Sequence, residues 1–242
     1  MISRAPKIGF DRFIDQEWAT IALQIRAGVA TLEDLAAVVN SSHRGEAAKK
    51  KTWTVLKRLW LEPRDDLIDF ADRGARLYRG VDGVSALTLT WGMAIAAYPF
   101  FGKVAEIVGR LSSLHGQCTS AEVQRRMAEL FGEREGTRRM TNMVLQSQTS
   151  WGAIERESDG RTISRRPPSE VNDGRVLEWL AEACLLYVGH ELSVSRLSAH
   201  PTMFPFKFGS TSSYSLSRSE SLAIRTDGAG NHVFGVAYKR AS

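Results

Sequence analysis

Polar residues recur along residues 137–151 at positions where a helix would present them to DNA. At about 100° per residue, one face of such a helix carries Arg138, Asn142, Leu145 and Thr149, with Thr141, Gln146 and Gln148 on its flanks. Arg pairs with guanine, Asn or Gln pairs with adenine, and hydroxyl groups reach phosphate oxygens. Asp and Glu, which phosphates repel, are absent from the segment. The pattern predicts a recognition helix whose residues facing the DNA groove are Arg138, Asn142, Gln146 and Thr149.

The opposite face of the same segment is expected to fill the core. Its members are Met140, Met143, Val144, Ser147 and Trp151. Arg161, Arg165 and Arg166 follow at and after a hairpin tip, and we expect Arg161 to reach a phosphate from there. Nearby acids at Glu155, Glu157 and Asp159 lower the local charge. An ordinary polar helix surface that contacts only water would show the same residue types, so that alternative stays open.

A second candidate for DNA contact is a basic helix near the N-terminus. Residues 44–64 hold seven Lys or Arg and two Glu, an excess that equals the net charge of +5 for the whole chain. The predicted core seam is Thr52, Leu56, Leu59 and Trp60. The cations expected to contact phosphates are Lys50, Lys51, Lys57 and Arg58. A solvated lysine face is the alternative. Trp60, like Trp151, lies on an apolar seam and is expected to be buried.

The residues that could support catalysis do not form a constellation. The five histidines never fall at metal-ligand spacing, and no Gly-rich phosphate loop or nucleophile elbow is present. Four acids, Asp65, Asp66, Asp69 and Asp72, could chelate a metal in a cleft, yet they follow Pro63 at a helix start, where acids favour the helix dipole. We therefore expect no enzyme activity, no catalytic residue, no metal site and no cofactor.

Composition indicates a folded chain that does not span a membrane. Of its 242 residues, 43% are hydrophobic and 24% are charged, and the two cysteines cannot build a disulfide framework. The most apolar stretch, residues 84–101, is diluted by Thr88, Thr90 and Gly92 and interrupted by Pro99, so it predicts a buried helix. We expect a cytoplasmic protein without a membrane partner.

Turn and capping signals divide the chain into four expected sections. Residues 1–64 form a helical, helix-turn-helix-like domain and residues 65–98 a helical connector that breaks at residues 80–83. Residues 99–168 show the order helix, helix, turn, helix, hairpin, which is the order of a winged helix-turn-helix. Residues 169–242 form an α+β domain with a helix over residues 176–188 and a hairpin over residues 221–239. The expected fold class is mainly α, a helical bundle with winged-helix units and short β-hairpins.

Residues 28–154 resemble BrxA, the small protein of the BREX phage-defence systems. The parallel lies in an ordered set of features. A Gly-Val and a short helix at residues 28–35 come first, and the basic helix at residues 49–61 follows. An apolar helix then runs into residues 97–108. Last comes the start of a capped helix at residues 119–123, ahead of residues 136–139. The tail after Pro168 departs from this pattern. The resemblance implies a cytoplasmic, mainly helical DNA-binding accessory protein without catalytic activity.

Together these observations favour a non-catalytic protein that binds double-stranded DNA through helix-turn-helix-like units. An accessory role in a bacterial anti-phage defence system, with other defence-system proteins as partners, follows from the resemblance. The alternative is a protein–protein scaffold module of a larger complex that makes no nucleic-acid contact, because many winged-helix domains dock proteins.

Overall fold

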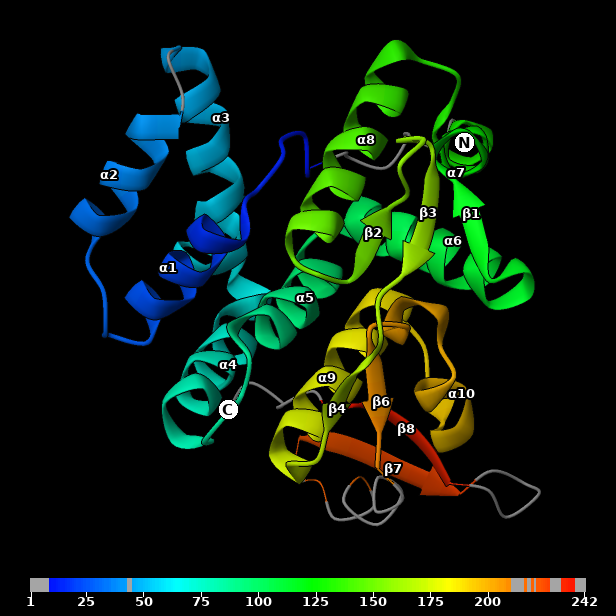
Figure 1. The fold of residues 1–242 in the computed structure, drawn as a ribbon. Coiled ribbons are helices and arrows are strands. Elements are labelled where there is room, and N and C mark those ends of the chain that lie inside the picture. The colour runs from blue at the N-terminus through cyan, green and yellow to red at the C-terminus, as the bar shows by residue number, and fades with distance from the viewer. Residues whose placement is uncertain are drawn as a thin grey trace, which may run out of the picture.

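Most of the described chain is helical, as the sequence predicts, with short strands gathered in small sheets (Figure 1). The computed structural model describes residues 9–42, 45–209, 216, 219, 221–226 and 232–237. Arg44, which belongs to the basic excess, and the expected turn at residues 227–231 lie outside these ranges.

The N-terminal elements are α1 (Gln16–Arg26), α2 (Leu32–Ser42), α3 (Glu46–Leu56) and a π-helical turn, η1 (Lys57–Leu61). Asp15 caps α1 by accepting the N–H of Glu17, and Gly28 follows the helix at φ +73°, a conformation that glycine adopts without strain. Arg26 donates from its guanidinium to the carbonyl of Trp60 at 2.8 Å. This bond satisfies a carbonyl at the end of the π-helical turn and ties α1 to it.

The next elements form the centre of the molecule. They are the 3₁₀ turn η2 (Asp65–Leu67), α4 (Ile68–Gly80), α5 (Ala86–Ala97) and α6 (Pro99–His115). All residues of α5 from Thr88 onward are buried, which confirms the expected buried helix. Within the described ranges, no helix combines the length and the apolar character that a membrane crossing requires. The kink between α5 and α6 falls at Pro99, whose fixed φ suits the first position of a helix.

After α6 come β1 (Gln117–Thr119), α7 (Ser120–Phe131), α8 (Glu135–Ser150), β2 (Ile154–Arg156) and β3 (Thr162–Arg165). Helix α6 and these five elements are called the central unit below. The last two strands form the expected hairpin. Strand β3 also pairs with β1, so the sheet order is β1-β3-β2 and all pairs are antiparallel. Sequence patterns did not indicate β1, because three residues with one buried side chain show no alternation to detect.

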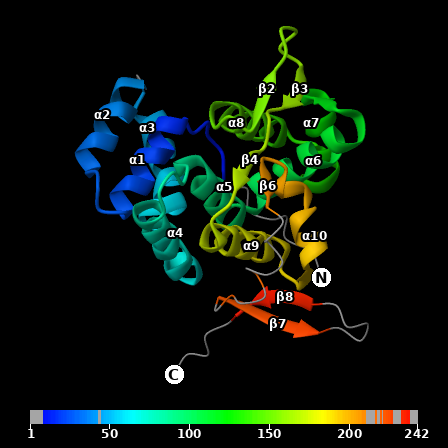
Figure 2. The same cartoon turned by 60° about the horizontal axis from the view of Figure 1, so that its bottom comes forward.

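The C-terminal elements pack below α5 and α6 in Figure 1 and come forward in Figure 2. They are β4 (Ser169–Val171), α9 (Gly174–Val188), β5 (Leu192–Ser193), α10 (Val194–Ser198), the 3₁₀ turn η3 (Pro201–Met203), β6 (Phe206–Phe208), β7 (Leu222–Thr226) and β8 (His232–Val236). Strands β7 and β8 pair antiparallel, as expected, and β5 joins them. Strands β4 and β6 form a parallel pair that the sequence did not indicate.

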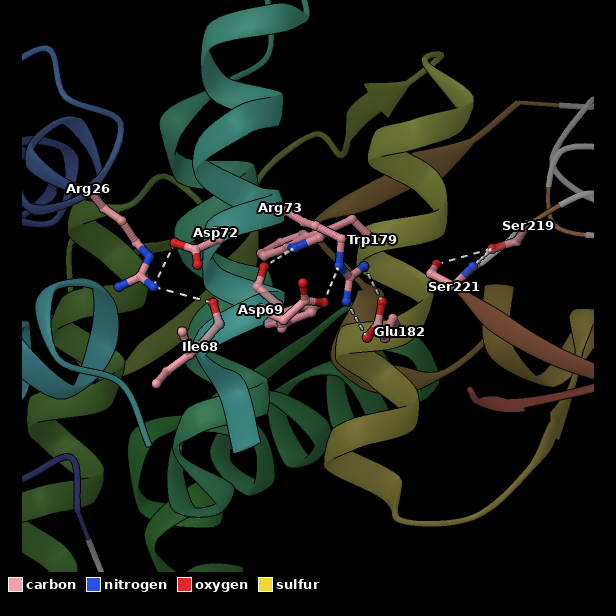
Figure 3. Close-up of polar contacts among 10 residues, drawn as sticks. Arg26, Ile68, Asp69, Asp72, Arg73, Trp179, Glu182, Ser219 and Ser221 are labelled. Atoms are coloured by element: carbon pink, nitrogen blue, oxygen red, sulfur yellow. Dashed lines mark hydrogen bonds and ion pairs between the residues drawn. The ribbon is translucent and has the colours of Figure 1, made fainter. Parts of the chain in front are cut away.

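Helices α4 and α9 meet at a seam that combines aromatic stacking with an ion pair (Figure 3). Trp179 stacks on Phe70 with ring centroids 4.3 Å apart and donates from Nε1 to the Phe70 carbonyl. Beside these rings, the guanidinium of Arg73 binds both carboxylate oxygens of Glu182, at 2.6 and 2.7 Å. Glu182 is only 4% exposed, so Arg73 supplies the opposite charge that its burial requires.

Helix α7 begins with a capping box. Oγ1 of Thr119 accepts the N–H of Glu122 at 3.2 Å, and the N–H of Thr119 donates to the Glu122 carboxylate at 2.7 Å. We expect Thr119→Ala to lower the free energy of unfolding by about 1 kcal/mol in urea denaturation at neutral pH. Ser158→Ala, at an exposed turn, is the control and should change it by less than about 0.5 kcal/mol.

The capping box also predicts a dependence on pH. The bonds from Thr119 hold the pKa of Glu122 below its ordinary value of 4.5. A carboxylate with a lowered pKa stabilises the fold above its ordinary pKa, and this contribution disappears as the pH falls through the lowered value. The loss caused by Thr119→Ala should therefore shrink in acid. An equal loss at neutral and acidic pH would contradict the proposed role of the ionised Glu122.

Candidate nucleic-acid interface

Helices α7 and α8 form an angled pair that packs on α6. Gly132 follows α7 at φ +88°, and its N–H donates to the Ala128 carbonyl, which ends the helix. A short turn then leads into α8 at Glu135. Because the turn is short, the first part of α8 lies next to the end of α7, and the two helices hold a fixed geometry.

The buried face of α8 is rotated from the one that the sequence predicts. Val144, Ser147 and Trp151 are buried as expected, whereas Met140 and Met143 are only half-buried. Leu145 was expected on the outward face, and this was wrong: its side chain is fully buried, as are those of Thr141 and Gln148. The reason is that α8 packs on α6, α7 and β2 together, so its buried arc is wider than a single apolar seam.

The four predicted contact residues of α8 lie outside this buried arc, with different degrees of exposure. Arg138 is exposed and forms an ion pair with Glu133 at 3.3 Å. Asn142 is half-buried, and its Oδ1 accepts a hydrogen bond from Arg156 on β2 at 3.0 Å. The remaining two, Gln146 and Thr149, are half-buried, and the Thr149 hydroxyl donates to the Leu145 carbonyl. Arg139, which the sequence pattern did not single out, is exposed on the same helix.

The hairpin of β2 and β3 lies against the N-terminal end of α7. The backbone N–H of Ser120 donates to the Arg161 carbonyl at 3.0 Å, so the hairpin tip is held beside that helix. The Arg161 side chain is exposed, as its predicted phosphate contact requires. The hydroxyl and N–H of Thr162 and the N–H of Arg161 hold the pKa of Asp159 below its ordinary value. Asp159 is therefore ionised at neutral pH and offsets part of the positive charge of the tip.

The predicted cations of the N-terminal helix are all exposed. Lys50 and Lys51 lie on α3, and Lys51 comes within 3.9 Å of Asp11. Lys57 and Arg58 lie on the π-helical turn, where Lys57 forms an ion pair with Glu62 at 2.8 Å. The expected seam of Thr52, Leu56, Leu59 and Trp60 is buried. The apolar side of this helix thus turns inward and its cations turn outward, as the sequence predicted.

Residues 9–15 run between the two candidate helices (Figure 1). The N–H of Ile14 donates to Oγ of Ser147 at 2.8 Å, and Nε1 of Trp151 donates to the Ile14 carbonyl at 3.0 Å. On the other side, Asp11 lies near Lys51. The predicted contact residues of α8 therefore lie on one side of this segment. The four predicted cations of α3 and η1, called the α3 cations below, lie on its other side. Phe10 and Ile14 in this segment are fully buried, and nothing in the sequence indicates that α8 is their partner.

The nucleophilic and metal-ligating residues show no reactive arrangement in the described ranges. Burial raises the pKa of Cys118 to about 11 and that of Cys184 to about 12, so both thiols stay protonated at neutral pH. No group of three or more His, Cys, Asp or Glu side chains among the described residues is placed to hold a metal ion. Asp65 and Asp66 are exposed on η2, and Asp69 is exposed in the first turn of α4.

No family model, no curated protein and no solved structure matches this chain. The resemblance of residues 28–154 to BrxA stays a prediction.

Proposed function

We propose that this protein binds double-stranded DNA without catalysing a reaction on it. The observation that carries the proposal is the central unit, in which a helix, a strand, two helices and a hairpin follow one another and the strands order as β1-β3-β2. A winged helix-turn-helix has this order. In such a unit α8 would enter the major groove and the β2–β3 hairpin would act as the wing.

The residue types on the side of α8 outside its buried arc support the proposal that this helix contacts DNA. Arg138 and Arg139 are exposed near its N-terminal end, and Asn142 and Gln146 follow at helical spacing. The ion pair of Arg138 with Glu133 and the hydrogen bond that Arg156 donates to Asn142 join exposed or half-buried groups, which exchange partners at little cost. On DNA, Arg138 would bind a phosphate or a guanine, and Asn142 would bind an adenine edge.

The α3 cations would add contacts to the phosphate backbone that do not depend on sequence. Lys50, Lys51, Lys57 and Arg58 are all exposed on one helical segment. Their ion pairs with Asp11 and Glu62 involve exposed or half-exposed side chains, so phosphates could replace the carboxylates. The resemblance to BrxA supports an accessory role in a cytoplasmic anti-phage defence system, where other defence proteins would be partners.

A protein-docking function is the second candidate, and exposed leucines favour it. Leu114 at the end of α6 is 71% exposed and Leu130 at the end of α7 is 57% exposed. Large apolar side chains at the surface are typical of contacts with another protein. In this case the polar side of α8 would bind a protein partner, while its internal bonds with Glu133 and Arg156 stay in place.

The two candidates differ in a DNA-binding measurement on the α8 residues. We expect the double variant Arg138→Ala/Asn142→Ala to bind labelled duplex DNA at least tenfold more weakly than the wild type, in fluorescence anisotropy at two salt concentrations. Its melting temperature should change little, because neither side chain is part of the buried core.

The matched control changes the same residue types far along the chain. Arg175 and Asn172 are exposed around the start of α9, and Arg175→Ala/Asn172→Ala should bind DNA like the wild type. Equal DNA affinity of the wild type and the Arg138→Ala/Asn142→Ala protein would exclude α8 as the reading helix and favour the docking function.

A further inference from the structure

A groove of about 630 Å³ lies between the central unit and the C-terminal elements. Its walls come from the C-terminal half of α6, the end of β3, the segment around η3, and β6. The volume is in the range of small-molecule sites. None of the proposed DNA-contacting residues of α3, η1, α8 and the hairpin lines the groove. DNA binding by those residues therefore does not account for it.

Three cationic side chains line the groove, and no Asp or Glu among the described residues lines it. They are Arg110, Arg165 and Lys207. Arg165 differs from the other two, because it donates from Nε to the Ser112 hydroxyl and from Nη2 to the Gly109 carbonyl, both of which are uncharged. Among the described residues it contacts no carboxylate, so its positive charge has no opposite charge beside it. An anion in the groove would supply that charge.

The other two cations, Arg110 and Lys207, form ion pairs with carboxylates but could still bind an anion. Arg110 binds Glu106 at 2.6 Å and Lys207 binds Glu170 at 3.1 Å. Their side chains are 64% and 67% exposed. The Lys207–Glu170 pair is exposed on both sides and contributes little to stability, so an incoming anion can replace the carboxylate. Glu106 is 13% exposed, but Lys103 and the Tyr187 hydroxyl remain its partners when Arg110 turns to an anion. Together the three side chains could bind an anion that carries several negative charges.

Aromatic rings are also part of the groove lining. Phe204, Phe206 and Phe208 line the groove, and the last two are half-buried, which leaves part of each ring accessible. The guanidinium of Arg165 lies over the Phe204 ring, 5.6 Å from its centroid. Phenylalanine rings beside a cation are the surface on which nucleic-acid bases stack in other proteins, because every base has a planar π-face.

We propose that this groove binds a nucleoside polyphosphate. The phosphates would lie toward Arg110, Arg165 and Lys207, and the base would stack on Phe206 or Phe208. A simple inorganic anion would leave the aromatic surface uncovered, and a neutral aromatic compound would leave the cations without a partner. A nucleotide combines the two chemistries that the groove offers. This site goes beyond the proposed DNA interface and does not depend on it.

Titration calorimetry of the intact protein with ATP, inorganic triphosphate and adenosine tests the proposal. Each is titrated separately in low salt without divalent cations. We expect ATP to bind saturably at one site and at least tenfold more tightly than either fragment, because it alone uses both the cations and the rings. Absence of saturable ATP binding would overturn the proposal, and so would equal affinities for ATP and triphosphate.

Variants locate the site. Arg110→Glu and Lys207→Glu, both at exposed positions, should each weaken ATP and triphosphate binding about tenfold. Phe208→Ala should weaken the binding of ATP and leave that of triphosphate unchanged. Arg125→Glu, an exposed cation on α7 outside the groove, is the matched control and should bind ATP like the wild type. Unchanged ATP affinity in both groove charge reversals would place the ligand elsewhere and overturn the assignment, whatever the result for DNA.

Discussion

Trp151→Ala is expected to lower the free energy of unfolding by about 3–5 kcal/mol, measured by chemical denaturation. The Trp151 side chain is 4% exposed and packs against Phe10 and Phe101, with ring centroids 6.2 and 5.3 Å away. Its Nε1 also donates to the Ile14 carbonyl. The substitution thus leaves a cavity and a buried carbonyl without its donor, and both effects destabilise the fold.

Two further variants separate these contributions. Trp151→Phe retains a ring and removes the N–H donor, so we expect a smaller decrease in stability, on the order of 1–3 kcal/mol. In a double-mutant cycle, Phe10→Ala and Trp151→Ala should be coupled by about 0.5–3 kcal/mol, because the two rings touch. Additive effects in the cycle would mean that Phe10 and Trp151 stabilise the protein independently, contrary to the contact between their rings.

The second large effect is a change in how the affinity for DNA depends on salt concentration. We expect the quadruple variant Lys50→Ala, Lys51→Ala, Lys57→Ala and Arg58→Ala to bind all duplex DNA sequences more weakly than the wild type. The slope of log affinity against log salt should flatten by about 0.9 for each phosphate that the variant no longer neutralises, or up to roughly 3.6 for four phosphates. Anisotropy titrations over a range of salt concentrations measure this slope directly.

A control for net charge is essential, because the variant also lacks four positive charges. Four exposed cations on α4, α9, α10 and β7 can be changed to alanine together: Arg76, Arg175, Arg196 and Arg225. This control should keep the wild-type slope. If both quadruple variants flatten the slope equally, the effect reflects net charge and not contact by the α3 cations.

How far the sequence predicts this structure depends on how local each signal is. The cap at Thr119 and the hairpin tip at Arg161 depend on signals within a few residues, and the elements they predict are present. The seam with Trp60 was also predictable, because that helix buries one face only. Local chemistry therefore predicted most of the helices and the hairpins.

Contacts between distant segments were not predictable in the same way. The rotated burial of α8 is the clearest case. Leu145 is buried because α6, α7 and β2 all contact the helix, and its spacing within residues 137–151 carries no trace of them. The bond from Arg156 to Asn142 is a second case, since it depends on how the hairpin lies against the helix. Periodicity identifies which residues could face outward, and tertiary packing decides which of them do.

The route of residues 9–15 has a consequence for the timing of folding. Ile14 bonds to Ser147, 133 positions further along the chain. During synthesis at about 5–20 residues per second, roughly 7–27 seconds separate the two residues. Throughout that interval Ile14 has no partner on α8, so residues 9–15 cannot reach their final packing until α8 has been made. Closures between such distant segments are slow folding steps, because the entropy of closing the long loop is lost before the contacts form.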